Sequence, residues 1–232
     1  MKHLKSTYLG LILILLSIAL LSLTSCNKKK WTETTAVTLK SDISESQVIL
    51  ANNPFIFDTL ILSINSLNFS GKRLQAEDVN IDKFLSLDVS FINTSTITEL
   101  MFPQGTYEEL NVQYQILPEN NCSLFISGEY HLSSSAVNQV KIKLNIDQYI
   151  VQQVLDSDNQ STILLEKDNP RSLNVTLDSE LLFSDINNGL WNAASVTSIN
   201  GSNTVQVDEL NNQSIYLALT SQLSNSISTK FE

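Results

Sequence analysis

The stretch Leu110-Asn111-Val112-Gln113-Tyr114-Gln115-Ile116 alternates apolar and polar side chains without interruption. Successive side chains of a β-strand point to opposite faces, so this stretch predicts a strand with one buried and one solvated face. The same alternation recurs at residues 85–91, 140–146 and 173–177. Several half-buried strands separated by turns predict an antiparallel β-sandwich.

One long stretch changes parity partway along. The even-numbered residues are apolar over 60–64, and the odd-numbered ones are apolar over 67–69. Such a switch predicts a β-bulge at Asn65-Ser66. The following SGKR, residues 70–73, predicts a turn. A second turn is expected at residues 102–107, FPQGTY, whose aromatic side chains should cover one end of the core.

The C-terminal third favours helices. Asp147 can cap a short helix that runs to Leu155, and Asp178 can cap a second one. A third helix is expected after Asp208, although the residues around 215–219 also alternate as in a strand. The apolar stripes that support the last two helices are Leu182, Ile186 and Leu190, and then Leu210, Tyr216, Leu219, Leu223 and Ile227. The predicted fold class is therefore mainly β, an antiparallel β-sandwich with a few short helices in the C-terminal third.

The first 25 residues predict an export signal. Lys2 and Lys5 precede an apolar run of Leu and Ile over residues 9–23, and polar Thr24 and Ser25 end it. A membrane-spanning helix needs about 20 predominantly apolar residues, and this run is shorter. We therefore expect residues 1–25 to be a signal peptide.

The tetrapeptide Leu23-Thr24-Ser25-Cys26 resembles the lipobox of bacterial lipoproteins. The resemblance implies that the Cys26 thiol receives a diacylglyceryl group, that the signal is cleaved before it, and that the lipid chains hold the protein on a membrane. The alternative is an uncleaved signal anchor in which Cys26 has no role. Asn27, where an inner-membrane retention signal would have Asp, and the absence of an acidic run after Cys26 favour the outer membrane of the cell envelope, without deciding its face.

Residues 26–47 are expected to form the lipidated cysteine and a flexible tether, with a possible first strand at 36–39, and residues 48–232 a single domain. Lys28, Lys29, Lys30 and Trp31 follow the predicted anchor. They suit contact with an anionic lipid surface, or equally a solvated linker.

Composition limits the partners. The chain carries a net charge of −10, and loss of Lys2 and Lys5 with the signal makes it more acidic, which argues against binding nucleic acid. If Cys26 is lipidated, Cys122 is the remaining cysteine and no intrachain disulfide can form. Cys122 is expected to act as a small buried hydrophobe, with a reactive or dimer-forming thiol as the alternative.

Residues for catalysis or cofactor binding are scarce, and no cofactor or metal is expected. His131 is the histidine that remains without the signal, and no Gly-x-Ser-x-Gly sequence is present. Asp156-Ser157-Asp158 begins like a calcium loop, but Ser161 and Lys167 replace the glycine and glutamate that an EF-hand needs. Glu108 and Glu109 are further carboxylates, for which the sequence names no partner.

Residues 82–87, 100–107 and 110–116 together resemble a family of uncharacterised bacterial lipoprotein domains. That family has a leucine-rich strand, then Leu-Pro-x-Gly-x-Tyr, then an alternating strand. Phe102 stands where the family tends to have Leu, and the similarity covers residues 55–145. The resemblance implies a transthyretin-like or immunoglobulin-like β-sandwich and no particular reaction.

These observations predict a membrane-anchored envelope lipoprotein that is not an enzyme and binds a protein or carbohydrate partner. One alternative is a subunit of a fimbria-like surface assembly, which would exchange a strand. Another is a hydrolase that uses only carboxylates, from Glu108, Glu109, Asp156 and Asp158. Asp58-Thr59-Leu60 also resembles a short O-glycosylation acceptor, whereas an ordinary strand threonine is the simpler interpretation.

Overall fold

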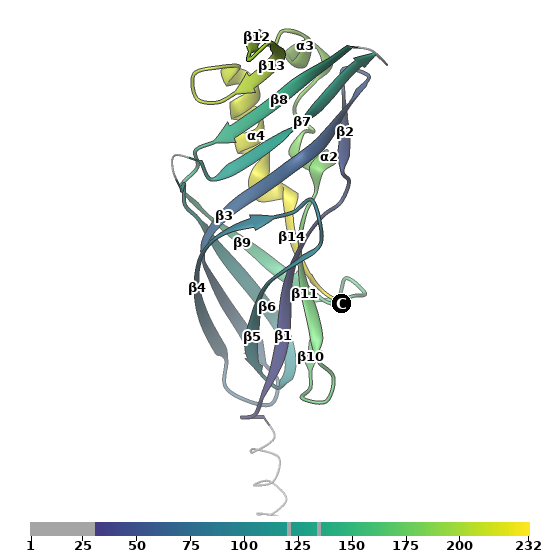
Figure 1. Ribbon diagram of the computed structural model, residues 1–232. Helices are drawn as coiled ribbons and strands as arrows, with labels where there is room; N and C mark the ends of the chain where they lie inside the picture. Colours follow the sequence, from purple (N-terminus) through teal and green to yellow (C-terminus); the bar gives the residue numbers. More distant parts are fainter. Residues whose placement is uncertain (1–30, 120–121, 134–135) are drawn as a thin grey trace, which may run out of the picture.

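The computed structural model describes residues 31–119, 122–133 and 136–232 (Figure 1). The predicted signal peptide, Cys26 and Lys28–Lys30 lie outside these residues. The described chain forms β1 (Thr34–Ile43), β2 (Gln47–Leu50), β3 (Asn53–Arg73), β4 (Val79–Ser90), β5 (Ser95–Pro103), β6 (Gly105–Ile116), β7 (Leu124–Ser133), β8 (Ala136–Leu144), β9 (Gln148–Leu155), β10 (Ile163–Leu165), β11 (Arg171–Leu177), α2 (Ser179–Leu182), α3 (Asn188–Asn192), β12 (Val196–Ile199), β13 (Ser202–Val207), α4 (Gln213–Ser226) and β14 (Ile227–Phe231).

A single mixed sheet joins the strands in the order β12-β13-β8-β7-β3-β6-β9-β14-β11-β1-β5, with β2 and β4 beside β3 and β10 beside β6. The mainly β fold with short helices mostly in the C-terminal third is confirmed. The expectation of purely antiparallel pairing is wrong, because β1–β11, β8–β13 and β9–β14 are parallel. Alternation of polarity shows which face of a strand is buried but not the direction of its neighbour.

The long strand β3 connects the two ends of the molecule. Its first half pairs with β7 and β2, and its second half pairs with β6 and β4. The register shifts between Ile64 and Ser66, so the predicted bulge is confirmed. The predicted turn at residues 70–73 is wrong, because β3 continues through Arg73 and pairs with β6 to that residue and with β4 to Gly71.

The sheet curves so that the end formed by β14, β11, β1 and β5 packs against the middle strands β3 and β6 around a shared core. Phe69 of β3 and Phe102 of β5 contact each other with ring centroids 5.2 Å apart, and the Tyr114 hydroxyl of β6 hydrogen-bonds the Thr229 hydroxyl of β14. The turn between β5 and β6 is as predicted, and Phe102 and Tyr107 beside it are fully buried. This packing covers one end of the core with aromatic rings.

The predicted helix over 147–155 is wrong, because these residues form β9 between β6 and β14. Ile150 and Val154 are buried, and a spacing of four residues fits one face of a strand as well as one face of a helix. Val151 distinguishes the two, since it lies on the opposite face and is 62% exposed.

The other two helices are confirmed in part. Asp178 caps α2 by accepting a hydrogen bond from the Leu181 amide at 2.9 Å. The stripe that begins at Leu182 is divided between α2 and α3, so it does not belong to one helix. The helix after Asp208 is α4, and Ile227 already belongs to β14.

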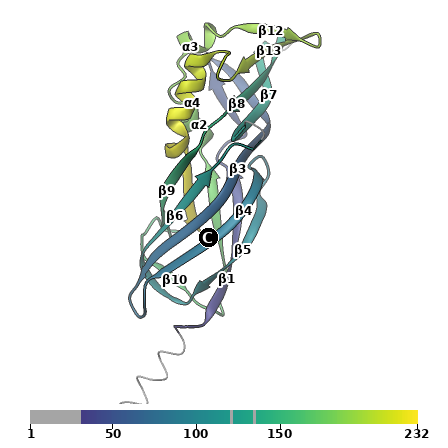
Figure 2. The same cartoon turned by 90° about the vertical axis from the view of Figure 1, so that its left-hand side faces the viewer.

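Part of the predicted N-terminal tether is folded. β1 pairs with both β11 and β5, so residues from Thr34 onward are part of the folded sheet and the expected boundary at residue 48 is wrong. The predicted strand at 36–39 lies within β1. Figures 1 and 2 place the start of β1 at one end of an elongated molecule and α3 and α4 toward the other. Within the described residues, no helix has the length and apolar character needed to cross a membrane.

Candidate binding face

The outer face of β4, β3, β6 and β9 is the strongest candidate for a binding site. These four strands lie side by side in this order, as Figure 2 shows. Directly opposite residues of paired strands share a face. The inner face of β6 carries the buried residues Leu110, Val112, Tyr114 and Ile116, as predicted, so its intervening residues point outward.

Three rows of outward side chains cross these strands, and we call them together the amide face. In order from β4 to β9, the rows are Phe84-Ser66-Gln115-Tyr149, then Asp82-Asn68-Gln113-Val151, then Asn80-Ser70-Asn111-Gln153. Amide and hydroxyl groups occupy most of these positions, and no lysine or arginine is among them.

The first row places an exposed aromatic ring at each of its ends. Phe84 is 71% exposed and Tyr149 is 60% exposed. Between them, the Gln115 amide donates to the Tyr149 hydroxyl at 2.9 Å and accepts from the Ser66 hydroxyl at 3.0 Å. The hydrogen bonds orient the Tyr149 ring, while the Phe84 ring has solvent around most of its surface.

The second and third rows leave hydrogen-bonding groups available. The Asn68 amide donates to Asp82 at 2.5 Å and to Asn80 at 2.6 Å. In the described part of the chain, by contrast, the side chains of Ser70, Gln113 and Gln153 make no hydrogen bond. A primary amide has two donor hydrogens and an acceptor oxygen, so this region can still bind a polar ligand.

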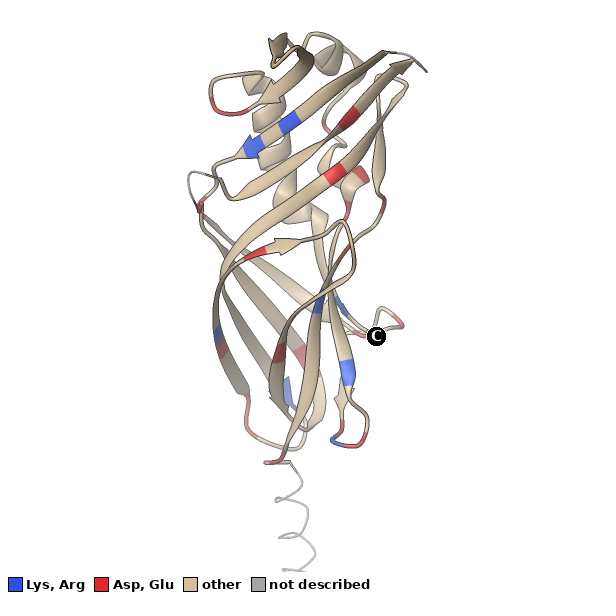
Figure 3. Cartoon of the chain, in the orientation of Figure 1, with Lys and Arg blue, Asp and Glu red and all other residues tan. Residues whose placement is uncertain are grey.

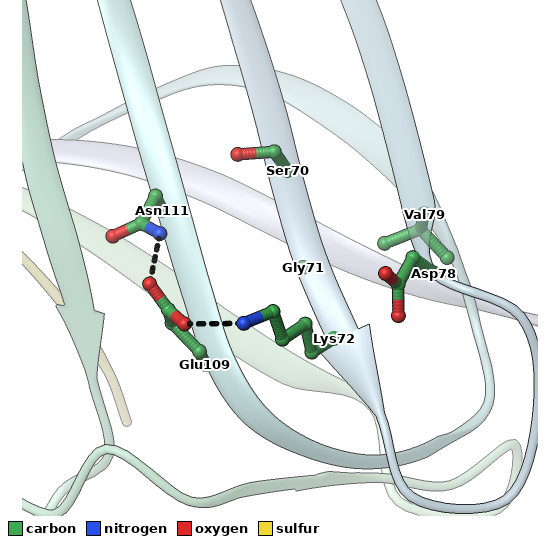
Figure 4. Close-up of a pocket in the computed structure, with 7 residues that line it drawn as sticks. All are labelled: Ser70, Gly71, Lys72, Asp78, Val79, Glu109 and Asn111. Atoms are coloured by element: carbon green, nitrogen blue, oxygen red, sulfur yellow. Dashed lines mark hydrogen bonds and ion pairs between the residues drawn. The ribbon is translucent and has the colours of Figure 1, made fainter.

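A pocket of about 290 Å³ lies at the third row and is lined by Ser70, Gly71, Lys72, Asp78, Val79, Glu109 and Asn111 (Figure 4). Lys72 lies 3.6 Å from Glu109, and the Asn111 amide donates to the same carboxylate at 3.0 Å. The hydrogen bond from Asn111, followed by the charge of Lys72, lowers the pKa of Glu109. The pocket therefore presents a neutralised ion pair rather than a proton donor.

Gly71 forms the floor of this pocket because core side chains occupy the space behind it. A β-carbon at this position would lie 2.9 Å from side-chain atoms of Leu110 and Tyr107. The close packing keeps the backbone of β3 near the core and leaves the hollow above it.

The structure does not assemble the predicted carboxylates into a catalytic pair. Glu109 pairs with Lys72, and Asp156 pairs with Arg171, whereas Glu108 and Asp158 are exposed. The described residues contain no group of three His, Cys, Asp or Glu side chains placed to hold a metal ion.

The remaining predicted residues occupy separate places. His131 lies near the end of β7, 3.4 Å from Glu129. Cys122 is only half-buried, and burial raises the pKa of its thiol, which makes it a poor nucleophile at neutral pH. Thr59 is a half-buried residue of β3 at a second register shift, beside exposed Asp58.

Sequence reasoning missed both rings of the amide face. Phe84 was detectable, since it is the apolar residue on the otherwise polar parity of 80–84. Tyr149 was hidden by the incorrect helix at 147–155.

No family model, curated protein or solved structure matches the chain.

Proposed function

We propose that the protein is a bacterial envelope lipoprotein, held on a membrane by lipid on Cys26, and that it acts as a non-enzymatic binding module through its amide face. The observation that carries the proposal is the pair of largely exposed rings, Phe84 and Tyr149, in one row of a polar strand face. Aromatic side chains are enriched where proteins bind their partners.

Three further features support a binding role over catalysis. The neighbouring pocket contains a neutralised Lys72–Glu109 pair, and the second carboxylate considered for hydrolysis, Asp156, is held by Arg171. The face stands on regular strands, which hold side chains in fixed positions. Its unused amide groups in the second and third rows provide donors and acceptors for a polar partner.

The test is binding of the lipid-free chain, residues 27–232, to envelope fractions of the producing bacterium. This chain retains the whole described core, from Val37 to Phe231. Ser70→Arg places a long charged side chain on the amide face beside its pocket, and Ser198→Arg makes the same change at an exposed position of β12. We expect Ser70→Arg to abolish binding and Ser198→Arg to leave it unchanged. Equal binding by both variants would refute the assignment of the face.

A second candidate function is a subunit of a fimbria-like assembly. The observation in its favour is that β4 and β5 each hydrogen-bond along one edge only, within the described residues. Leu87 of β4 is also 41% exposed on the side that faces the core. An added strand could pair with such edges. Purified lipid-free protein that stays monomeric before and after limited proteolysis would count against this function.

A further inference from the structure

We propose that the ligand of the amide face is a neutral carbohydrate chain that lies across β4, β3, β6 and β9 from Phe84 to Tyr149. This inference rests on the proposed binding function and specifies its ligand class. It joins three independent observations, which are the two rings of the first row, the amide and hydroxyl groups without hydrogen bonds in the second and third rows, and the absence of cationic side chains among the residues of the face.

The rings suit the apolar side of a sugar. The π face of an aromatic ring carries partial negative charge, and the C–H groups on one side of a pyranose carry partial positive charge, so the two surfaces attract each other when stacked. Phe84 is the most exposed phenylalanine of the described chain, and its ring lies outside the core. A ring in this position can accept a stacked sugar without any rearrangement of the fold.

The spacing of the rings suits a chain rather than a single sugar. Three interstrand steps separate Phe84 from Tyr149, which corresponds to about 14 Å at about 4.8 Å for each step. Both rings can contact one ligand only if it is extended over this length. Beside the row of the rings, Gln113 of the second row has an amide that makes no hydrogen bond in the described chain.

The amide groups suit hydroxyl groups. A sugar hydroxyl both donates and accepts hydrogen bonds, and so does the side chain of Asn or Gln. Gln113 lies in the second row, and Ser70 and Gln153 lie in the third row on either side of Asn111, so these groups stand on three neighbouring strands. A ligand with hydroxyl groups at intervals along its length can satisfy all three together.

The charges of the face favour a neutral ligand. Lys72, which lines the pocket at the third row, is already paired with Glu109, while Asp82 accepts a hydrogen bond from Asn68. Figure 3 shows charged residues of both signs dispersed along the strands, and the lysines of β8, Lys141 and Lys143, belong to a strand outside the amide face. A polyanion would have no cationic partner here, and the protein as a whole carries a net charge of −10.

The experiment treats the envelope fraction with periodate, which cleaves sugar diols, or with protease, and then measures binding of the lipid-free chain. The comparison includes Phe84→Ala, Tyr149→Ala and, as the control, Met101→Ala at an exposed position of β5. We expect periodate to abolish binding and protease to leave it intact. Each ring variant should lose affinity by about tenfold or more, as expected for loss of an aromatic anchor. Met101→Ala should bind as the unaltered chain does.

Salt concentration distinguishes neutral from charged carbohydrate. Binding of a neutral chain should be the same at low and high ionic strength, because screening does not affect it. Binding that protease removes and periodate spares, or that salt abolishes, would overturn the carbohydrate inference. The proposed function fails separately, if Ser70→Arg binds the untreated envelope as well as the unaltered chain does.

Discussion

At the scale of single residues, two buried tyrosines make the stability of the fold depend on alkaline pH. Burial raises the pKa of Tyr107 to about 12 from its ordinary value of 10.0, and the pKa of Tyr114 is raised further for the same reason. Between pH 10 and about pH 12, Tyr107 loses its phenolic proton in the unfolded chain and keeps it in the folded chain. The free energy of unfolding must therefore fall as the pH rises through this range.

Tyr107→Phe should therefore weaken this pH dependence. The substitution also removes the hydrogen bond to the Pro103 carbonyl, so we expect it to lower the free energy of unfolding at neutral pH by about 0.5–1.5 kcal/mol. Denaturant titrations at neutral and alkaline pH measure both effects. An unaltered slope above pH 10 in the variant would show that Tyr107 does not cause the decline.

Gly128 of β7 has a strict steric requirement. A β-carbon there would lie 2.0 Å from the Ile56 carbonyl oxygen, so Gly128→Ala should destabilise the fold by about 3 kcal/mol or more. The control is Gly189→Ala in α3, where the nearest atom lies 3.3 Å away and stability should change by less than about 1 kcal/mol. Thermal melts compare the melting temperatures of the two variants. Similar melting temperatures would contradict the close approach of β3 and β7.

Individual burial was predictable from the sequence wherever two-residue periodicity was clear. The inward residues of β6, β8 and β11 are buried as expected. Gly128 was not predictable, because its constraint comes from a neighbouring strand more than 70 residues earlier in the sequence. The amide face was not predictable for the same reason, because each of its rows joins residues of four strands that are distant from one another in the sequence.

At the scale of elements, β1 is the largest difference between prediction and structure. Its polar residues suggested a tether, but Val37 and Leu39 are fully buried between β11 and β5. Polar residues on the outer face of a strand resemble a linker when only a few apolar residues alternate with them. The pairing partners of β1 are distant in the sequence, so local patterns could not reveal them.

Leu39→Ala tests the structural role of β1. Loss of a fully buried leucine should lower the free energy of unfolding by about 2–5 kcal/mol. Thr34→Ala, at the exposed start of the strand, should change it by less than about 0.5 kcal/mol. Denaturant titration measures the free energy of unfolding of both variants. If Leu39→Ala left it unchanged, the result would support a flexible tether at these residues instead of a folded strand.

At the scale of the whole molecule, β3 makes the fold a single unit. It contributes Leu60 and Leu62 to the part that pairs with β7, and Leu67 and Phe69 to the part that pairs with β4 and β6. If β3 unfolds, both parts lose core residues at once, so neither part can unfold alone. We therefore expect one cooperative unfolding transition. Calorimetry would show one peak, and two separate peaks would contradict this coupling.

The anchor can be tested in the full-length chain. Cys26→Ser removes the thiol that the predicted lipid needs, so the variant should lose the fatty-acid label that the unaltered protein incorporates in growing cells. Metabolic labelling followed by immunoprecipitation measures this. An unaltered protein that carries no label would favour the uncleaved signal anchor.

The most direct test of the amide face measures its accessibility in the native envelope. In a Cys122→Ser background, cysteine replaces Ser70 on the amide face or Ser198 on β12, and the rate of alkylation is compared between intact envelopes and detergent-purified protein. We predict that the envelope slows alkylation at position 70 and leaves position 198 unchanged, because the ligand covers the face. Equal rates at position 70 in both preparations would contradict the account.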